Sequence, residues 1–207
     1  MICTHDSYTY QKPKNIFMNL IQFWWRCQKK TIQEQYDLGT RVFDVRVYRN
    51  HDKWGTAHGF AHFDISFDTI SHVCQYFQSN FNNSIIRIFL EDNVNKNEIL
   101  KKLFLTESEE AFNKYENILW EIGTHHPWLA YYRNKNFHPQ IKEYYCHLFN
   151  WNTDQSIKEN LKHIDLTSIS LPLYSKKHNI EITQEMIDDQ NTMYIFDYIG
   201  IYPKNKG

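Results

Sequence analysis

Two charged residues interrupt the otherwise apolar segment Val42–Val47, and they are the first candidates for chemistry. Side chains of a β-strand alternate between its two faces, so Asp44 and Arg46 share one face. The apolar side chains occupy the other face, which can pack against helices. Because burying an unpaired charge is costly, we expect Asp44 and Arg46 to lie in a polar site. The alternative is that Asp44 and Arg46 pair with partners inside the fold and have no function.

Two histidines follow other short segments that read as strands, at His5 and His58. An imidazole takes and returns a proton near neutral pH. An arginine stabilises the charge that builds on phosphoryl oxygens. His5, His58 and Arg46 would together supply a base, an acid and a fixed cation, which is the set needed for displacement at a phosphodiester.

The pattern of apolar residues predicts strands that alternate with helices. Strands are predicted over residues 2–4, 40–49, 54–60, 84–91 and 193–199, and helices over residues 13–30, 32–38, 67–77 and 95–119. Residues 120–187 have no clear pattern. Such alternation is typical of a parallel sheet covered by helices.

We therefore predict an α/β fold, a compact single domain over residues 1–207 arranged as an incomplete TIM (β/α) barrel. Barrels of this kind keep their active sites at the carboxyl ends of the strands, where His5, Arg46 and His58 fall. A complete barrel typically has ~250 residues. A chain of 207 residues would therefore form a shortened version of it.

The composition describes a packed globular protein, with 42% hydrophobic and 16% aromatic residues. The formal net charge of -1 indicates no general attraction to nucleic acid, so no nucleic-acid partner is expected. The cysteines form no CxxC pair, which argues against a zinc knuckle. No segment reaches the ~18 apolar residues of a membrane span, and no signal peptide is visible. We expect a monomer that is cytoplasmic or peripherally associated with a membrane.

Three segments together resemble phosphatidylinositol-specific phospholipase C, in its bacterial and X-domain-only branch. They are Thr4-His5-Asp6-Ser7, the pattern Q-x(3)-G-x-R-x-x-D-x-R over residues 35–46, and Ala57-His58-Gly59. The resemblance covers residues 3–92 and the end of the chain from residue 193. It implies a distorted TIM barrel that cleaves the glycerophospho bond of an inositol phospholipid. The products would be a cyclic inositol phosphate and diacylglycerol, as expected of a phosphorus–oxygen lyase.

The resemblance also implies roles for individual residues. His5 would be the general base that takes the proton of the inositol 2-hydroxyl. His58 would be the general acid that protonates the leaving diacylglycerol oxygen, and Arg46 would neutralise the phosphate. In a second step, water could open the cyclic phosphate while the two histidines exchange roles.

Three carboxylates would support the histidines and the arginine: Asp44, Asp6 and Asp197. By the family pattern, Asp197 orients His5 and Asp6 assists His58. A carboxylate bonded to a histidine fixes its tautomer and raises its basicity.

Arg46 also bears on the need for a metal. Calcium-dependent relatives place a carboxylate there, because Ca²⁺ requires several oxygen ligands. A guanidinium supplies positive charge without a metal, so no cofactor is expected. Calcium, held by Glu91 and Asp44, is the alternative.

Glu91 and Arg87 share the inward face of the strand predicted over residues 84–91 and are candidate substrate-binding residues. The simpler interpretation is that Glu91 forms an ion pair with Arg46 or Arg87.

The expected partner is a phospholipid substrate at a membrane surface. Residues that grip its headgroup are not recognisable, and Arg133, Asp154 and Lys177 are the candidates. Two tryptophans could lie at the membrane interface. Helical spacing predicts Trp24 in the core and Trp25 on the surface.

Two other functions stay open. A glycerophosphodiester- or sphingomyelinase D-like barrel hydrolase would need an acidic cluster and a divalent ion, and Arg46 argues against it. A catalytically inactive lipid-headgroup binder would not need to keep both proton carriers, so the presence of His5 and His58 argues against it.

Overall fold

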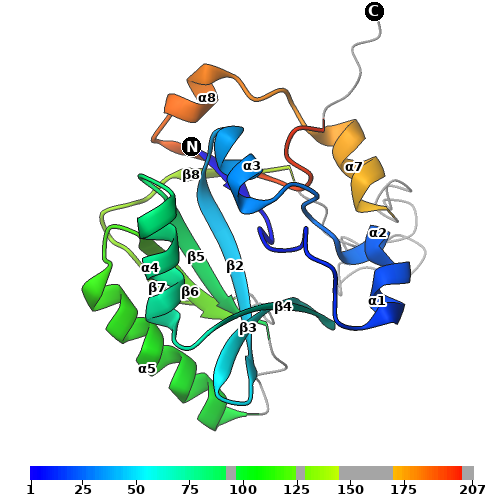
Figure 1. The fold of residues 1–207 in the computed structure, drawn as a ribbon. Helices are drawn as coiled ribbons and strands as arrows, with labels where there is room; N and C mark the ends of the chain where they lie inside the picture. Colours follow the sequence, from blue (N-terminus) through cyan, green and yellow to red (C-terminus); the bar gives the residue numbers. More distant parts are fainter. Residues whose placement is uncertain (92–96, 125–128, 145–169, 202–207) are drawn as a thin grey trace, which may run out of the picture.

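Helices and strands alternate along the chain in a computed structural model that describes residues 1–91, 97–124, 129–144 and 170–201 (Figure 1). The strands are β1 (Ile2–Thr4), β2 (Thr40–Asn50), β3 (Lys53–His58), β4 (Ala61–Phe67), β5 (Ile85–Leu90), β6 (Leu119–Thr124), β7 (Leu129–Arg133), β8 (Gln140–Tyr144) and β9 (Thr192–Phe196). The helices are α1 (Ile16–Leu20), α2 (Gln22–Trp25), α3 (Ile32–Asp37), α4 (Ile70–Asn80), α5 (Glu98–Lys114), α7 (Leu171–His178) and α8 (Gln184–Asp188).

One curled sheet joins these strands in the order β7-β6-β5-β2-β1-β9-β8. Strands β6, β5, β2, β1, β9 and β8 run parallel to their neighbours. Strand β7 is antiparallel to β6, and β3 and β4 form an antiparallel hairpin on β2. Among the described strands, β7 and β8 stand at the two ends of the sheet. The architecture is an incomplete barrel, which confirms the predicted fold class.

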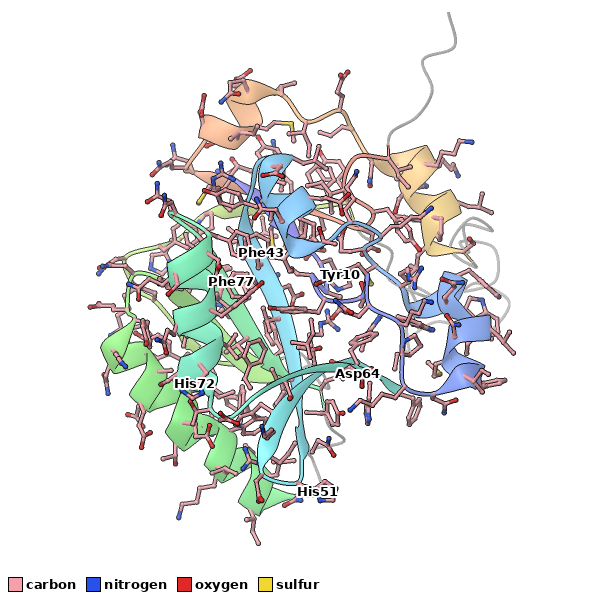
Figure 2. All side chains as sticks on the ribbon, viewed as in Figure 1. Tyr10, Phe43, His51, Asp64, His72 and Phe77 are labelled. Carbon is pink, nitrogen blue, oxygen red and sulfur yellow. The ribbon has the colours of Figure 1, made fainter. Side chains whose placement is uncertain are left out.

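The main core lies between the sheet and helices α4 and α5, on the left in Figure 1. Phe43, Val45 and Val47 of β2 are fully buried in it. Phe43 faces Phe77 of α4 with 4.9 Å between ring centroids (Figure 2). Each large apolar side chain buried in this way contributes about 1.5–3 kcal/mol to stability. Strand alternation then directs Asp44 and Arg46 away from the helices, toward the inner face of the sheet.

The helix predicted over residues 13–30 is instead two short helices, α1 and α2, which meet at Ile21. The break shifts the helical register, and the prediction for the two tryptophans is wrong for this reason. Trp25 is 5% exposed and its indole N–H donates to the Met18 carbonyl, whereas Trp24 is 44% exposed.

Other differences lie in the middle of the chain. The strand predicted over residues 54–60 ends at His58 and continues as the hairpin strand β4. Helix α4 begins later than predicted because the Thr69 side chain accepts a hydrogen bond from the His72 amide and caps the helix. The stretch without a clear pattern contains β6, β7, β8, α7 and α8. Strand β8 is mostly exposed, so no apolar alternation marked it.

Within the residues described, no helix combines the length and the apolar character that crossing a bilayer requires.

Candidate active site

Polar side chains gather at the carboxyl edge of the sheet. Strands β9, β1, β2 and β5 are neighbours and parallel, so their carboxyl ends meet at one edge. Thr4 of β1 pairs with Phe196 of β9 and with Phe43 of β2. The side chains placed there or on the adjoining hairpin are those of His5, Asp6, Asp44, Arg46, His58, Glu91 and Asp197.

The His5 ring is held from both sides. Its Nδ1 lies 2.8 Å from Asp197 Oδ1, and its Nε2 lies 2.6 Å from Arg46 Nη2. A guanidinium only donates hydrogen bonds, so Nε2 must accept, and Nδ1 carries the proton that is donated to Asp197. His5 is therefore a neutral imidazole whose basic nitrogen faces Arg46.

Arg46 is completely buried among three carboxylates. Its Nε lies 2.9 Å from Asp6 Oδ1, its Nη2 3.4 Å from Asp44 Oδ2 and its Nη1 3.6 Å from Glu91 Oε2. Burial alone would lower the pKa of Arg46, but these three carboxylates together raise it. The guanidinium is thus a permanent cation at the centre of the site.

His58 differs from His5 in its hydrogen-bond partners. Its Nδ1 lies 2.5 Å from the Trp25 carbonyl oxygen, to which Nδ1–H donates. Its Nε2 lies 3.3 Å from Asp6 Oδ2. Burial and the charge of Arg46 lower the pKa of His58 to about 3. His58 is therefore neutral near pH 7, with the lone pair of Nε2 facing Asp6.

Asp6 complements this state of His58. Burial raises the pKa of Asp6 well above its usual range, and Asp44, Glu91 and Asp197 add to the effect against the opposing charge of Arg46. A protonated Asp6 carboxyl can donate to an imidazole that is neutral. We therefore describe Asp6 and His58 as a pair that shares one proton, rather than as two opposite charges.

Asp44 remains ionised in the same buried surroundings. Burial would raise its pKa, but the charges of Arg46 and Arg87 lower it. Asp44 thus balances the charge of the guanidinium beneath the histidines.

The turn after β1 fixes Asp6 in a left-handed conformation, with φ of 47°. Asp tolerates this conformation better than most residues, at a cost of about 1 kcal/mol. The backbone oxygen of Asp6 accepts hydrogen bonds from the amide and the hydroxyl of Thr9. Gln35, the first residue of the 35–46 motif, donates to the Ser7 carbonyl and so ties α3 to this turn.

Glu91 connects Arg46 to the hairpin turn that follows His58. Its Oε1 accepts a hydrogen bond from the Gly59 amide, while Oε2 faces Arg46. Gly59 has φ of 55°, and a Cβ there would contact nothing, so the glycine is favoured by its backbone conformation alone. Of the two ion pairs expected for Glu91, the structure forms the one with Arg46.

Arg87 lies deeper on the inner face, beside Asp44 in the sheet register. Its Nε is 2.8 Å from Glu121 Oε2, and Arg133 Nε is 2.7 Å from the other oxygen of the same carboxylate. Contact of Arg87 or Glu91 with a substrate stays a prediction.

Of the other headgroup candidates, Arg133 is half exposed at the end of β7, and Lys177 lies on α7. Asp154 is outside the described residues.

Three residues of the segment around the end of α2 enter the site without any signal in the sequence. The Trp25 carbonyl holds His58, and Cys27 Sγ lies 3.8 Å from His58 Nδ1. Gln28 donates to the carbonyl of His5 and to that of Phe196, so it ties the ends of β1 and β9 together. Only knowledge of the three-dimensional path of this segment could have identified them.

No family profile matches the sequence, and no match to a curated protein is found. Solved structures of the phosphatidylinositol-specific phospholipase C of Staphylococcus aureus are similar in fold. A variant of that enzyme has a TM-score of 0.55 at 13% identity and covers 97% of this chain and 85% of its own. A structure concerned with that enzyme's membrane binding has a TM-score of 0.54 at 14% identity, over 97% of this chain and 86% of its own.

The phosphatidylinositol-specific phospholipase C of Listeria monocytogenes matches with a TM-score of 0.49 at 16% identity, over 99% of this chain and 88% of its own. At such identities the similarity to the S. aureus structures concerns the fold. This chain thus has the incomplete-barrel fold of bacterial phosphatidylinositol-specific phospholipase C, with its polar cluster at the carboxyl edge of the sheet.

Proposed function

We propose that this protein is a phosphodiesterase that cleaves the glycerophospho bond of an inositol phospholipid, releasing a cyclic inositol phosphate and diacylglycerol. One observation carries the proposal. The rings of His5 and His58 lie 6.4 Å apart between centroids, and Arg46 is bonded to His5 directly and adjoins His58 through Asp6. Two proton carriers and a cation around one point suit a single phosphate.

His5 serves as the base in this scheme. The oxygens of a bound phosphate compete for the N–H groups of Arg46, which releases His5 Nε2 to take the proton of the inositol 2-hydroxyl. The freed oxygen attacks phosphorus, and the guanidinium stabilises the charge on the phosphoryl oxygens. Asp197 stabilises the imidazolium that forms on His5.

The Asp6–His58 pair serves as the acid. An anionic phosphate beside His58 raises the pKa of its ring, so the shared proton moves from Asp6 to His58 and on to the leaving diacylglycerol oxygen. The base gains one proton and the acid loses one. Acid–base catalysis of this kind contributes roughly 10²–10⁴-fold to a rate. Hydrolysis of the cyclic product would return both protons as the histidines exchange roles.

The scheme needs no metal ion, because Arg46 provides the positive charge at the phosphate. The buried carboxylates Asp44 and Glu91 then act as counter-ions of Arg46 rather than as calcium ligands.

Exposed apolar side chains next to the site support a lipid substrate. Helices α1 and α2 expose Ile16, Phe17, Leu20 and Trp24, and Phe60 at the hairpin turn is 80% exposed. Met18 and Trp25 on the other side of these helices pack against Ala61 and Phe63 of β4. The helices and the turn are therefore neighbours, and we propose that they dock on a membrane.

Phosphorus NMR of phosphatidylinositol vesicles incubated with the protein tests the proposal. We expect a cyclic inositol phosphate signal that is lost in His5→Ala and in His58→Ala, while circular dichroism shows both variants folded. Release of a phosphomonoester without a cyclic intermediate would favour the metal-dependent hydrolase. Vesicle binding without any turnover would favour the headgroup binder.

A further inference from the structure

Cys27 lies in the candidate active site, and the proposed mechanism gives it no role. Its Sγ is 3.8 Å from Asp6 Oδ2, 3.8 Å from His58 Nδ1 and 3.5 Å from the Trp25 carbonyl oxygen. The residue is 1% exposed, and its backbone is fixed by hydrogen bonds to Thr9 and Tyr198. The thiol is thus held in a defined place beside the proposed acid.

A thiolate, an imidazole nitrogen and a carboxylate oxygen are the ligands that Zn²⁺ takes in proteins. The ligand atoms of Asp6, Cys27 and His58 all lie within 4.8 Å of one another. Tetrahedral Zn²⁺ holds its ligands at about 2.0–2.3 Å, which places them roughly 3.3–3.7 Å apart. Asp6 Oδ2 lies 3.8 Å from Cys27 Sγ and 3.3 Å from His58 Nε2, and both separations are close to that spacing.

A second set of three ligands contains Cys27, His5 and Asp197. It suits a metal less well, because His5 Nδ1 and Asp197 Oδ1 are already hydrogen-bonded at 2.8 Å. Two ligands of one tetrahedral ion cannot stay that close. The geometry therefore favours the set with Asp6 and His58.

Charge favours a cation at the same place. The carboxyl groups of Asp6, Asp44 and Glu91 lie within 3.6 Å of the Arg46 guanidinium, and that of Asp197 lies 2.8 Å from His5 Nδ1. The acidic groups outnumber the cation, so a bound divalent ion would offset their excess. The His58 side chain is 17% exposed and gives solvent ions access to the cluster.

We propose that Asp6, Cys27 and His58 form an inhibitory Zn²⁺ site, with the fourth position of the ion open to water. On binding, the Cys27 S–H bond breaks and a Zn–S bond forms, and the proton shared by Asp6 and His58 is displaced as well, so two protons pass to solvent. The ion occupies the imidazole lone pair and the carboxylate that would otherwise carry the catalytic proton. The inhibition rests on the proposed function, whereas the binding of the ion does not.

Titration of the full chain with Co²⁺, followed by displacement with Zn²⁺, tests the binding by absorption spectroscopy. We expect one equivalent of Co²⁺ to give a thiolate-to-cobalt charge-transfer band and the visible bands of a tetrahedral ion. Cys27→Ala should lose the charge-transfer band and weaken Zn²⁺ binding by about 100-fold or more. Cys74→Ala is the matched control, because Cys74 is also a buried free thiol but lies in the main core on α4.

Turnover of phosphatidylinositol measured in parallel tests the inhibition. Zn²⁺ should inhibit the wild-type chain and Cys74→Ala alike, and chelator should restore both. Cys27→Ala should stay active at Zn²⁺ concentrations that inhibit the wild type. A charge-transfer band or Zn²⁺ inhibition that survives unchanged in Cys27→Ala overturns the site. Co²⁺ bound through Cys27 in a chain without any turnover would keep the metal site and refute the proposed enzyme.

Discussion

Arg46 Nη2 lies 2.6 Å from His5 Nε2, so the proposed phosphate-binding cation is hydrogen-bonded to the proposed base. This contact requires a neutral His5 with its lone pair on Nε2. The base is kept in its active protonation state by the group that the substrate must engage. Binding of a phosphate to Arg46 would therefore also uncover the base.

Arg46→Lys tests the need for a planar guanidinium. An ammonium keeps one positive charge among the three carboxylates, so we expect the chain to fold. It lacks the planar pair of N–H groups that can bond two phosphoryl oxygens, so kcat should fall by about 10²–10³-fold. Arg46→Ala should instead lower the melting temperature strongly, because it leaves buried carboxylates without a counter-ion. An unchanged kcat in Arg46→Lys would exclude this role of the guanidinium.

Asp197→Asn tests the orientation of His5. The amide can no longer stabilise a charged His5 ring, so kcat should fall by roughly 10²–10⁴-fold while KM changes little. Asp52→Asn is the control, because Asp52 lies in the exposed turn beside His51, at the far end of the β2–β3 hairpin (Figure 2). A loss that appears in KM alone would contradict the assignment.

Much of this site could be predicted because its residues are exceptions to a clear strand pattern. Asp44 and Arg46 lie among apolar residues that a buried strand requires, so alternation alone placed both on the inner face. His5 and His58 end short strands, and Gly39, with φ of 96°, ended α3 near the expected position. In each case a local rule and the final fold agree.

The rest depended on contacts between distant segments. Cys27 reaches His58 only because the segment after α2 crosses the edge of the sheet, and no spacing in the sequence encodes that path. Glu91 forms its ion pair with Arg46, whereas Arg87 forms one with Glu121. Glu121 lies on β6, a strand that the sequence pattern did not predict. The exposed strand β8 is fixed by pairing with β9 rather than by apolar periodicity.

His58 should make the free energy of unfolding depend on pH. Comparison with the variant His58→Gln tests this dependence. The pKa of His58 is about 3 in the folded chain, below the ordinary value of 6.5. Protons therefore favour the unfolded state once the pH falls below about 6.5. The free energy of unfolding of the wild type should decrease relative to His58→Gln, by at most about 1.4 kcal/mol per pH unit.

Urea unfolding of both chains at pH 7.5, 6.5 and 5.5 measures this difference. Titrating groups other than Asp6, the partner of His58, are common to the two chains and cancel in the comparison, so the difference reports the Asp6–His58 pair. Free energies that change in parallel over this range would show that His58 takes up its proton in the folded chain.

Glu91 variants separate its two contacts and test the role of calcium. Glu91→Gln keeps an oxygen for the Gly59 amide but removes the charge facing Arg46, whereas Glu91→Ala removes both. We expect Glu91→Gln to keep activity within about tenfold and Glu91→Ala to lose more, because a lost bond of about 1.5–3 kcal/mol loosens the turn that carries His58.

Turnover by the wild type in excess chelator is the companion measurement. Activity should persist, since Arg46 supplies the charge. Activity abolished by chelator and restored only by Ca²⁺ would instead make Glu91 and Asp44 metal ligands.

The exposed apolar side chains of α1, α2 and the hairpin turn should control membrane binding. Trp24→Ala combined with Phe60→Ser removes two large apolar groups, each worth about 1.5–3 kcal/mol when buried in lipid. Co-sedimentation with phosphatidylinositol vesicles should weaken by at least about tenfold. Hydrolysis of soluble cyclic inositol phosphate should not change, because neither side chain has a role in the proposed acid–base steps. Ile99→Ala is the control, since Ile99 is 84% exposed but belongs to α5, which lies on the lower left of Figure 1, away from α1 on the right. Equal losses of vesicle binding in the double variant and in Ile99→Ala would show that general surface apolarity, rather than this face, holds the protein on lipid.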